Sequence, residues 1–560
     1  MVVFNDTEET KRIDFLRKRE EEELAQMLAG KYGVEYVDLS LVAVNTDALR
    51  LLTEDEAHDA EIVAFGRVGK RVTVAARSPE NPKAKAMIQK LKDLGYEVTV
   101  FITSSESLKR AFTRYADLSY ATESKAGVFE LSNQELEDLL SKVKGLSDIS
   151  ALVKDAIDLK RAYRITRILE VILAGGLSTN ASDVHFEPEE AAVRLRYRLD
   201  GVLVDVLTFD HETYKQVLSR LKLLSGLKLN VADEAQDGRF SIKIKGAEIE
   251  LRTSVLPGNY AETMVLRILN PKSIGVPLEE LGLEPELRAR IEREITKPNG
   301  MILNTGPTGS GKTTTLYAFL RKVNSPGSKI ITIEDPIEYH LQGVVQTQVD
   351  KKTYTFAAGL RSALRQDPDI IMIGEIRDEE VASTAINAAL TGHLVFSTLH
   401  TNDAAGTFPR LIDLGISEKV LSSSVNVAMA QRLVRKLCAQ CRKTRPATPG
   451  EQQIIDRVLA DLTNKALLPP QTGTIYDASP EGCPECHGSG YKGRIGIFEA
   501  IFMDRAIEEI LRSKPSEREV AEAAKPQGIP TLQQDGILKV LRGVTSLDEL
   551  RRVIDIDSVN

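Results

Sequence analysis

Apolar and polar residues alternate along the first fifth of the chain with two different periods. Over residues 61–76 (EIVAFGRVGKRVTVAA) the period is two, which predicts a β-hairpin. Over residues 81–95 (NPKAKAMIQKLKDLG) apolar residues recur at helical spacing between an Asn-Pro start and a glycine end, and a strand is predicted at 96–102. Residues 11–29 are predicted to form a charged helix. These elements predict a small α/β module over residues 1–115.

A second group of alternating segments follows a polar stretch at 116–160, which we interpret as a linker with a short helix or two. A helix is predicted over 161–176. Period-two alternation then returns in four segments, as in antiparallel strands: 182–188, 192–206, 240–256 and 263–269. Asn-Pro, Gly and Pro within 270–283 mark a boundary. The sequence therefore predicts a second α/β domain over residues 161–272.

The remaining segment, residues 273–560, differs because its apolar runs are continuous. The runs IITI at 330–333, IIMI at 370–373 and LVFSTL at 394–399 are short and almost wholly apolar. Strands that are buried on both faces of a parallel sheet have this pattern. Acidic or histidine side chains follow each run, at the edge where such sheets place ligands.

Length and charge limit the possible classes of protein. A chain of 560 residues exceeds what one hydrophobic core supports, so three or four domains are expected. The net charge of −8 weighs against a dedicated nucleic-acid binder. No apolar run approaches the roughly 20 residues of a membrane span, and the first residues do not resemble a signal peptide. We therefore expect a cytoplasmic protein, in which paired cysteines more often bind metal than form disulfides.

The segment 300–320 (GMILNTGPTGSGKTTTLYAFL) combines an apolar strand, a glycine-rich turn and a helix. The turn fits the pattern G-x-x-x-x-G-K-[ST], in which backbone N–H groups and the helix N-terminus bind phosphates. We expect Lys312 to reach the β- and γ-phosphates of a nucleotide and the Thr313 hydroxyl to bind Mg²⁺. The expected binding residues are Gly306, Pro307, Thr308, Gly309, Ser310, Gly311, Lys312, Thr313 and Thr314.

Acids and histidines at the strand ends supply further candidate chemistry. Glu375 follows the 370–373 run, where a carboxylate can hold Mg²⁺ through water or polarise the attacking water. One of the carboxylates after the 330–333 run could be a general base. The candidates at the other strand ends are Glu334, Asp335, Glu338, His393 and His400. The alternative for Glu375 is a cap of the next helix, and for the three acids after the 330–333 run it is a solvated loop. For the histidines, the alternative is a satisfied structural histidine.

All four cysteines occur in two C-x₂-C pairs, Cys438 with Cys441 and Cys483 with Cys486. Such pairs supply two thiolate ligands each to a tetrahedral Zn²⁺. The 41 residues between the pairs exceed the usual zinc-ribbon spacing, so free thiols remain the alternative. Two pairs disfavour a thioredoxin-like redox motif.

Several motifs occur in one order: the phosphate loop, TIEDPIEY, LRQDPDIIMIGEIRD and TGHLVFSTLHTN. Together with SDVHFEP and RLRYRLDG upstream, and AQRLVRKLC and GYKGRIGIFE downstream, they resemble the secretion-motor ATPases of type II secretion and type IV pili. The resemblance covers about residues 160–560. It implies a PAS-like α/β second domain, a RecA-like ATPase core with a zinc module at about 435–500 and C-terminal helices, and a hexameric ring that uses ATP, Mg²⁺ and Zn²⁺.

The resemblance also implies roles for individual residues. Glu338 would be the general base and Glu375 the acid near Mg²⁺. The supporting residues around them would be Glu334, Asp335, His393 and His400. Arginines from the second domain would contact the nucleotide, at Arg239, Arg252 and Arg267. Guanidinium groups bind phosphate oxygens bidentately and stabilise transition-state charge, which suits that role.

Within the family, the resemblance is to members with a tetracysteine zinc module and a long N-terminal module, features that the dedicated retraction motors generally lack, which implies an assembly or secretion motor. We expect an enzyme that hydrolyses ATP to power type IV pilus assembly through an inner-membrane platform protein. The type II secretion ATPase is the close alternative. The protein would be a homohexamer, cytoplasmic and peripheral at the inner membrane through its partners. Residues 1–60 lack the R-L-G-x-x-L motif with which some relatives bind cyclic di-GMP, so that ligand is not expected.

Two hypotheses of other classes remain. A nucleic-acid translocase on the same core would need basic pore loops, and the acidic balance argues against it. A scaffold without hydrolysis is disfavoured because Lys312, Glu338 and Glu375 are all present.

Overall fold

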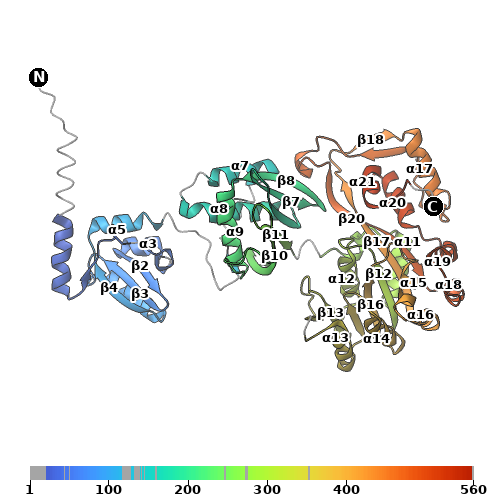
Figure 1. Ribbon diagram of the computed structural model, residues 1–560, viewed down its shortest axis with the longest axis horizontal. Coiled ribbons are helices and arrows are strands. Elements are labelled where there is room, and N and C mark those ends of the chain that lie inside the picture. Colours follow the sequence, from blue (N-terminus) through green and yellow to red (C-terminus); the bar gives the residue numbers. More distant parts are fainter. Residues whose placement is uncertain are drawn as a thin grey trace, which may run out of the picture. The chain divides into compact units, whose positions relative to one another are not determined.

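The computed structural model (Figure 1) describes residues 20–42, 44–49, 51–115, 128–130, 139, 142–143, 145–157, 161–244, 247–270, 275–350 and 353–557. Residues 11–19 of the predicted charged helix and much of the predicted linker lie outside these ranges. The chain divides into two compact units, one with the N-terminal sheet and one with the two larger sheets. Each is described by itself, and the boundaries predicted at residues 115, 160 and 272 stay predictions.

The N-terminal sheet has the strand order β1-β4-β3-β2. Its elements are β1 (Glu35–Tyr36), α2 (Thr46–Leu49), α3 (Glu54–Asp59), β2 (Ile62–Val68), β3 (Arg71–Ala76), α4 (Pro82–Asp93), β4 (Glu97–Ile102) and α5 (Ser105–Phe112). The antiparallel pair β2 and β3 is the predicted hairpin, and Gly69 in its turn has a φ of +62°. The side chain of Asn81 caps α4 by accepting a hydrogen bond from the Lys83 N–H.

Six strands in the middle of the chain pair antiparallel in the order β9-β10-β11-β6-β7-β8. The elements of this region are β5 (Val128–Glu130), α7 (Leu146–Ile157), α8 (Arg161–Ser178), β6 (Asp183–Pro188), β7 (Val193–Leu199), β8 (Val202–Phe209), α9 (His211–Leu224), β9 (Gln236–Ile244), β10 (Ala247–Leu256) and β11 (Thr263–Leu269). Alternation places Val193, Leu195 and Tyr197 of β7 in the core. The pairing confirms the predicted antiparallel strands, but the segments 192–206 and 240–256 each correspond to two strands, β7 with β8 and β9 with β10.

The C-terminal sheet has the order β14-β13-β15-β16-β12-β17-β20 and is parallel except for β20. Its strands are β12 (Gly300–Thr305), β13 (Ile330–Glu334), β14 (Val345–Gln348), β15 (Ile370–Ile373), β16 (Leu394–Leu399), β17 (Val425–Leu437) and β20 (Tyr491–Phe502). Parallel pairing brings the carboxyl ends of β12, β13, β15 and β16 to one edge. The predicted strand ends therefore meet where ligands bind in open α/β sheets.

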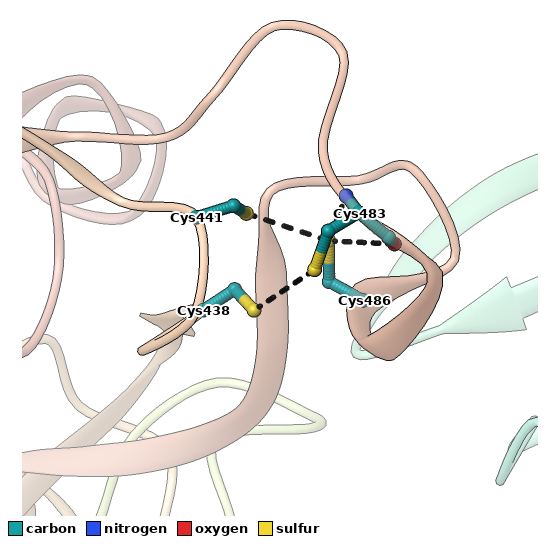
Figure 2. Close-up of side chains that lie close together, drawn as sticks. All are labelled: Cys438, Cys441, Cys483 and Cys486. Atoms are coloured by element: carbon teal, nitrogen blue, oxygen red, sulfur yellow. Dashed lines mark hydrogen bonds between the residues drawn. The ribbon is translucent and has the colours of Figure 1, made fainter.

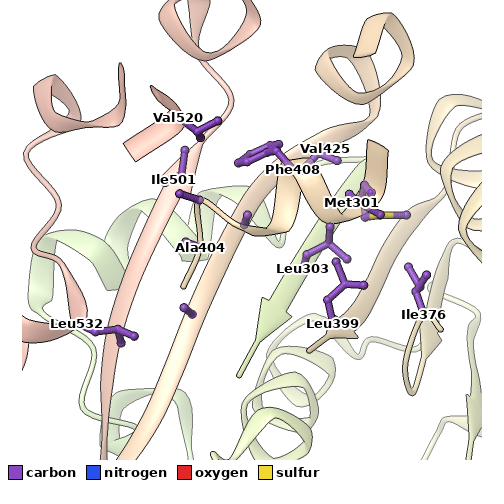
Figure 3. Close-up of a cluster of buried hydrophobic side chains, with 14 of the residues drawn as sticks. Met301, Leu303, Ile376, Leu399, Ala404, Phe408, Val425, Ile501, Val520 and Leu532 are labelled. Carbon is purple, nitrogen blue, oxygen red and sulfur yellow. The ribbon is translucent and has the colours of Figure 1, made fainter. Parts of the chain in front are cut away.

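Helices cover this sheet. They are α11 (Pro285–Glu294), α12 (Lys312–Val323), α13 (Phe356–Ala363), α14 (Glu379–Leu390), α15 (Thr407–Asp413), α16 (Glu418–Ser424), α17 (Pro449–Leu459), α18 (Arg505–Leu511), α19 (Glu517–Ala524), α20 (Leu532–Leu541) and α21 (Leu547–Val553). Alternate residues of β12 enter different cores. Met301 and Leu303 lie in the core shown in Figure 3, together with Phe408 and Val425, whereas Ile302 packs against the helix of the phosphate loop.

The observed architecture confirms the predicted mixed α/β fold class. The three strands predicted from apolar runs, β13, β15 and β16, are buried at every position. Their side chains contribute to two hydrophobic cores. In the described part of the chain, no helix is both long and apolar enough to cross a membrane.

Candidate active site and metal centre

The phosphate loop connects the buried strand β12 to α12 through three glycines with positive φ. Gly306 has a φ of +148°, Gly309 of +81° and Gly311 of +90°. Space as well as conformation demands glycine here, because a Cβ on Gly306 would lie 2.6 Å from the backbone oxygen of Gln431. The hydroxyl of Ser310 is buried within the turn and has no hydrogen-bond partner among the described residues. The turn therefore has the backbone of an anion cradle.

Lys312 folds back over this turn. Its ammonium donates to the backbone oxygens of Gly306 at 2.6 Å and Pro307 at 3.1 Å. Burial lowers the pKa of Lys312 to about 8, Glu375 partly opposes that shift, and Arg432 adds to it. The ammonium is thus placed where phosphate oxygens could replace two carbonyl acceptors. Thr313 follows at the exposed first turn of α12.

Gln431, on β17, hydrogen-bonds to residues on both sides of the phosphate loop, a role that the sequence motifs do not predict. Its side-chain oxygen accepts hydrogen bonds from Asn304 Nδ2 and Thr315 Oγ1, each at 2.8 Å. These bonds join the strand before the loop to the helix after it. Only the sequence AQRLV pointed to this strand, as part of the family resemblance. The neighbouring Arg432 donates to the backbone oxygen of Asn402 at 2.7 Å.

Glu375 lies just beyond the carboxyl end of β15 and is mostly buried. His400, at the end of β16, places Nε2 3.2 Å from Glu375 Oε2, and Arg377 pairs with the other carboxylate oxygen. β12, β15 and β16 are parallel, so Glu375 and His400 follow strands that end at the same sheet edge as the strand before the phosphate loop. The structure thus brings Lys312, Glu375 and His400 together at one sheet edge.

Glu334 at the end of β13 is an internal anchor. Its side chain accepts hydrogen bonds from Tyr317, from Thr332 Oγ1 at 2.5 Å and from Gln346 Nε2 at 3.1 Å, and the residue is buried. These bonds tie β13 to α12 and β14. Asp335, the next residue, is exposed and lies near Arg377.

Glu338 lies in the loop after β13, and about a third of its side chain is exposed. Burial raises the pKa of its carboxyl group, and Arg252 and Arg267 oppose that shift. Arg252 donates to the backbone oxygen of Ile337 at 2.8 Å and places Nη1 3.8 Å from Glu338 Oε2. Glu338 therefore combines partial burial with two nearby guanidinium groups.

The three candidate arginines form one row across the middle sheet. Arg252 of β10 is the direct register partner of Arg239 on β9 and of Arg267 on β11. Arg239 is exposed and has no hydrogen bond or ion pair among the described residues. Like charges directly opposite each other destabilise a sheet, so this row favours an anionic ligand.

His393 is not brought to the phosphate loop within this chain. It precedes β16, whereas His400 follows it, and a strand of this length separates the two by roughly 20 Å. The Nδ1 of His393 contacts the backbone oxygen of Ala388 at 3.0 Å. The two histidines therefore lie at opposite ends of β16, and the supporting role expected for His393 stays a prediction.

The four cysteine sulfurs converge from two turns (Figure 2), and all lie within 4.8 Å of one another. Cys438 and Cys483 are separated by 3.7 Å between sulfurs, and Cys441 and Cys486 by 3.8 Å. Zn–S bonds of about 2.3 Å in a tetrahedron place sulfurs about 3.8 Å apart, whereas a disulfide is close to 2 Å. The donor set and its spacing therefore fit a closed zinc site.

The 41 residues between the cysteine pairs form a folded insertion. β18 (Lys443–Pro446) pairs antiparallel with β19 (Thr474–Asp477), and α17 lies between them. Because Lys443 pairs with Asp477, the first and last strands of the insertion bring its two ends close together. The long spacing is thus compatible with one four-thiolate site.

Comparisons with known proteins agree with these features. A family model described as Type II/IV secretion system protein matches residues 158–552, and one described as MshEN domain matches residues 32–122. Type II secretion system protein E of Pseudomonas aeruginosa is 41% identical over 79% of this chain and 85% of its own length. Type IV pilus assembly ATPase PilB of Acinetobacter baylyi is 44% identical over 95% of this chain and 88% of its own length.

The match to PilB of Myxococcus xanthus is 36% identical and covers 95% of this chain and 91% of that protein. Among solved structures, the Yersinia pseudotuberculosis ATPase DotB aligns over 71% of this chain and 94% of its own, with a TM-score of 0.50 and 20% identity, which supports the fold alone. The family model and the long matches to both groups of relatives lead to one assignment. The chain belongs to the type II/IV secretion system protein family.

Proposed function

We propose that this protein is a motor ATPase that hydrolyses ATP to power type IV pilus assembly. The observation that carries the proposal is the arrangement of Lys312, Glu375 and His400 after parallel strands that end at one sheet edge. It occurs in a chain whose matches to two type IV pilus assembly ATPases each cover 95% of its length.

The phosphate loop would hold the β- and γ-phosphates of ATP. The residues from Gly306 to Gly311, apart from Pro307, would supply backbone N–H groups, and Lys312 would exchange two backbone oxygens for phosphate oxygens. Gln431 hydrogen-bonds to both the strand before the loop and the helix after it. The loop residues in this proposal are Gly306, Pro307, Thr308, Gly309, Ser310, Gly311, Lys312, Thr313 and Thr314.

Thr313 and Glu375 are the groups that would hold Mg²⁺, whose oxygen-ligand preference they fit. When bound, Mg²⁺ neutralises charge that develops on the phosphates. Arg377 and His400 fix the Glu375 carboxylate from two sides. That fixation leaves Glu338 as the better candidate for the general base, because its carboxylate is less engaged and its pKa is raised by burial.

Arg239, Arg252 and Arg267 would contact the phosphates from the middle sheet. Their alignment in one row concentrates positive charge that the described residues only partly neutralise. An anionic nucleotide would relieve that repulsion, and guanidinium groups would stabilise charge in the transition state. Nucleotide binding would thereby be linked to the position of the middle sheet.

The four cysteines would hold one structural Zn²⁺. With Cys438, Cys441, Cys483 and Cys486 all contributing thiolates, no coordination position remains for a substrate. The site joins the end of β17 to the turn before β20, so its role would be to fix that junction.

The active form would be a homohexamer that works in the cytoplasm, peripheral to the inner membrane, on a platform protein of the pilus machinery. No nucleic-acid client is proposed. The type II secretion ATPase is the second candidate. It is supported by 41% identity to type II secretion system protein E of Pseudomonas aeruginosa over 85% of that protein.

Deletion of the gene, with complementation by wild type and by Lys312→Ala, tests the client. We expect the deletion to remove surface pili and to leave type II secretion intact, with wild type alone restoring pili. Loss of secretion with intact pili would establish the second candidate instead. A pull-down with this protein as bait provides an independent test, because the membrane partner that it recovers would belong either to the pilus machinery or to the type II secretion system.

A further inference from the structure

Asp183, the first residue of β6, continues the row of arginines across the middle sheet. It is the register partner of Arg267 on β11 and of Arg198 on β7. Its side chain is only 7% exposed. A carboxylate so deeply placed costs free energy unless it is paired and hydrogen-bonded. A buried acid at this position is therefore expected to have cationic and hydrogen-bonding partners.

Both carboxylate oxygens of Asp183 are engaged. Oδ1 accepts a hydrogen bond from Arg267 Nε at 3.0 Å. Oδ2 accepts one from Ser182 Oγ at 2.8 Å and lies 3.3 Å from Arg198 Nε. The acid is thus held on one side by Arg198 and Ser182 and presents its other oxygen to Arg267.

Arg267 uses only its Nε in this pair. Its side chain is 63% exposed, and its two terminal nitrogens have no hydrogen bond among the described residues. A guanidinium held at Nε keeps both terminal nitrogens available as a fork for phosphate oxygens. Without the acid, the exposed side chain of Arg267 could sample many rotamers, and its neighbour Arg252 would repel it.

We propose that Asp183 is a positioning residue for Arg267, which orders that guanidinium for the phosphates of the nucleotide. The inference rests on the proposed contact of Arg267 with the nucleotide. Asp183 itself touches neither substrate nor metal in this account. Its effect on catalysis should therefore pass through Arg267.

A double-mutant cycle on ATP turnover tests this path, with Asp183→Asn, Arg267→Gln and the combined variant in the full chain. We expect Asp183→Asn alone to lower kcat about tenfold to a hundredfold, as misplacement of a catalytic group does. In the Arg267→Gln background the same change should lower kcat less than twofold. KM for ATP should move less than kcat, because ordering of Arg267 matters most in the transition state.

Asp205→Asn is the matched control. Asp205, on β8 of the same sheet, pairs with Arg196 Nε at 3.0 Å but lies outside the row. It should keep the wild-type kcat. If Asp183→Asn does not fold, as judged by its thermal transition, Ser182→Ala takes its place in the cycle. It keeps the carboxylate and removes the hydrogen bond to Oδ2, together with a longer one to the backbone oxygen of Arg198. We expect a smaller loss of kcat that again disappears in the Arg267→Gln background.

Two results would overturn the proposal and are distinguishable from failure of the proposed function. Equal losses of kcat from Asp183→Asn in both backgrounds would mean that Asp183 acts independently of Arg267. A silent Asp183→Asn beside a damaging Arg267→Gln would remove the positioning role alone. A wild-type kcat for Arg267→Gln would instead remove the proposed nucleotide contact of Arg267, and the inference with it.

Discussion

The charge of Lys312 should depend on whether phosphate is bound in the loop. Its ammonium is partly buried and bonded to two backbone oxygens, and burial lowers its pKa to about 8 from an ordinary value of 10.5. A bound phosphate would favour the charged form. Proton uptake should therefore accompany nucleotide binding above pH 8.

The first prediction concerns the pH dependence of ADP binding. Affinity should be constant from pH 7 to about 8 and should then fall with pH, by up to tenfold per pH unit, because free Lys312 loses its proton. Calorimetric titration with ADP at constant Mg²⁺ measures it. Lys312→Arg should lack this slope, since a guanidinium stays charged. The same slope in both proteins would assign it to another group.

The second prediction concerns Glu338. Glu338→Gln should lower kcat by at least about a hundredfold, as loss of a general base does, and should leave ADP affinity unchanged. Because burial raises the pKa of Glu338 while Arg252 opposes that shift, Arg252→Gln should move the acid limb of the kcat–pH profile to higher pH. Steady-state turnover and ADP titration measure these effects. Loss of ADP binding in Glu338→Gln would indicate a structural role.

The sequence predicts functional residues best where their partners are neighbours along the chain. The strand, glycines and lysine of the phosphate loop could be placed because one short segment contains them all. Gln431 could not, because its partners Asn304 and Thr315 lie more than 100 residues away. For His393, adjacency in sequence to a strand does not say which end of that strand meets the site, so its supporting role stays a prediction.

At the scale of elements, β17 links the two functional regions of the C-terminal sheet. Its middle carries Gln431 beneath the phosphate loop, and its end leads into the first cysteine pair. The partner strand β20 follows the second pair and is antiparallel to β17 over most of its length. A metal at the cysteines would therefore hold together the ends of a strand pair that supports the nucleotide site.

The third prediction follows from this arrangement. Purified protein should contain about one Zn²⁺ per chain, and Cys483→Ser should lose it. Removal of one ligand should lower the thermal midpoint by roughly 4–8 °C, if it costs about 2 kcal/mol of stability. Elemental analysis and calorimetry measure both.

Glu485→Gln provides the control within the same turn, because Glu485 is exposed and its ion pair is with Lys492. It should retain zinc and the wild-type midpoint. Zinc-free wild-type protein with an unchanged midpoint would contradict the metal site.

Element types were largely predictable, because period-two alternation and continuous apolar runs distinguish antiparallel from parallel strands. Their arrangement was less so. The register that aligns Arg239, Arg252 and Arg267 depends on pairing between strands, which no local pattern reports. The paired strands β18 and β19 were also missed, although they explain how cysteines 41 residues apart can share a site.

Across the chain, the family assignment and the geometry of the site both support the proposed motor ATPase. The family model spans residues 158–552, and that range contains the arginine row, the phosphate loop and the cysteine cluster. The proposed motor would use the first two for hydrolysis and the third for stability. The order of the motifs along the chain is enough to predict a motor ATPase of this family from sequence. The motifs do not predict the domain boundaries, and they do not describe the surfaces that would bind a pilus or a secretion client.

The most direct test of this account is steady-state ATP hydrolysis by the purified full chain in Mg²⁺, measured for wild type and Lys312→Ala in parallel. Loss of the ammonium removes the charge that holds the β- and γ-phosphates, so wild type should turn over ATP and Lys312→Ala should show no turnover above background. Lys312→Ala should retain the wild-type thermal midpoint. Hydrolysis by Lys312→Ala at the wild-type rate would contradict the central claim that this phosphate loop is the site of ATP hydrolysis.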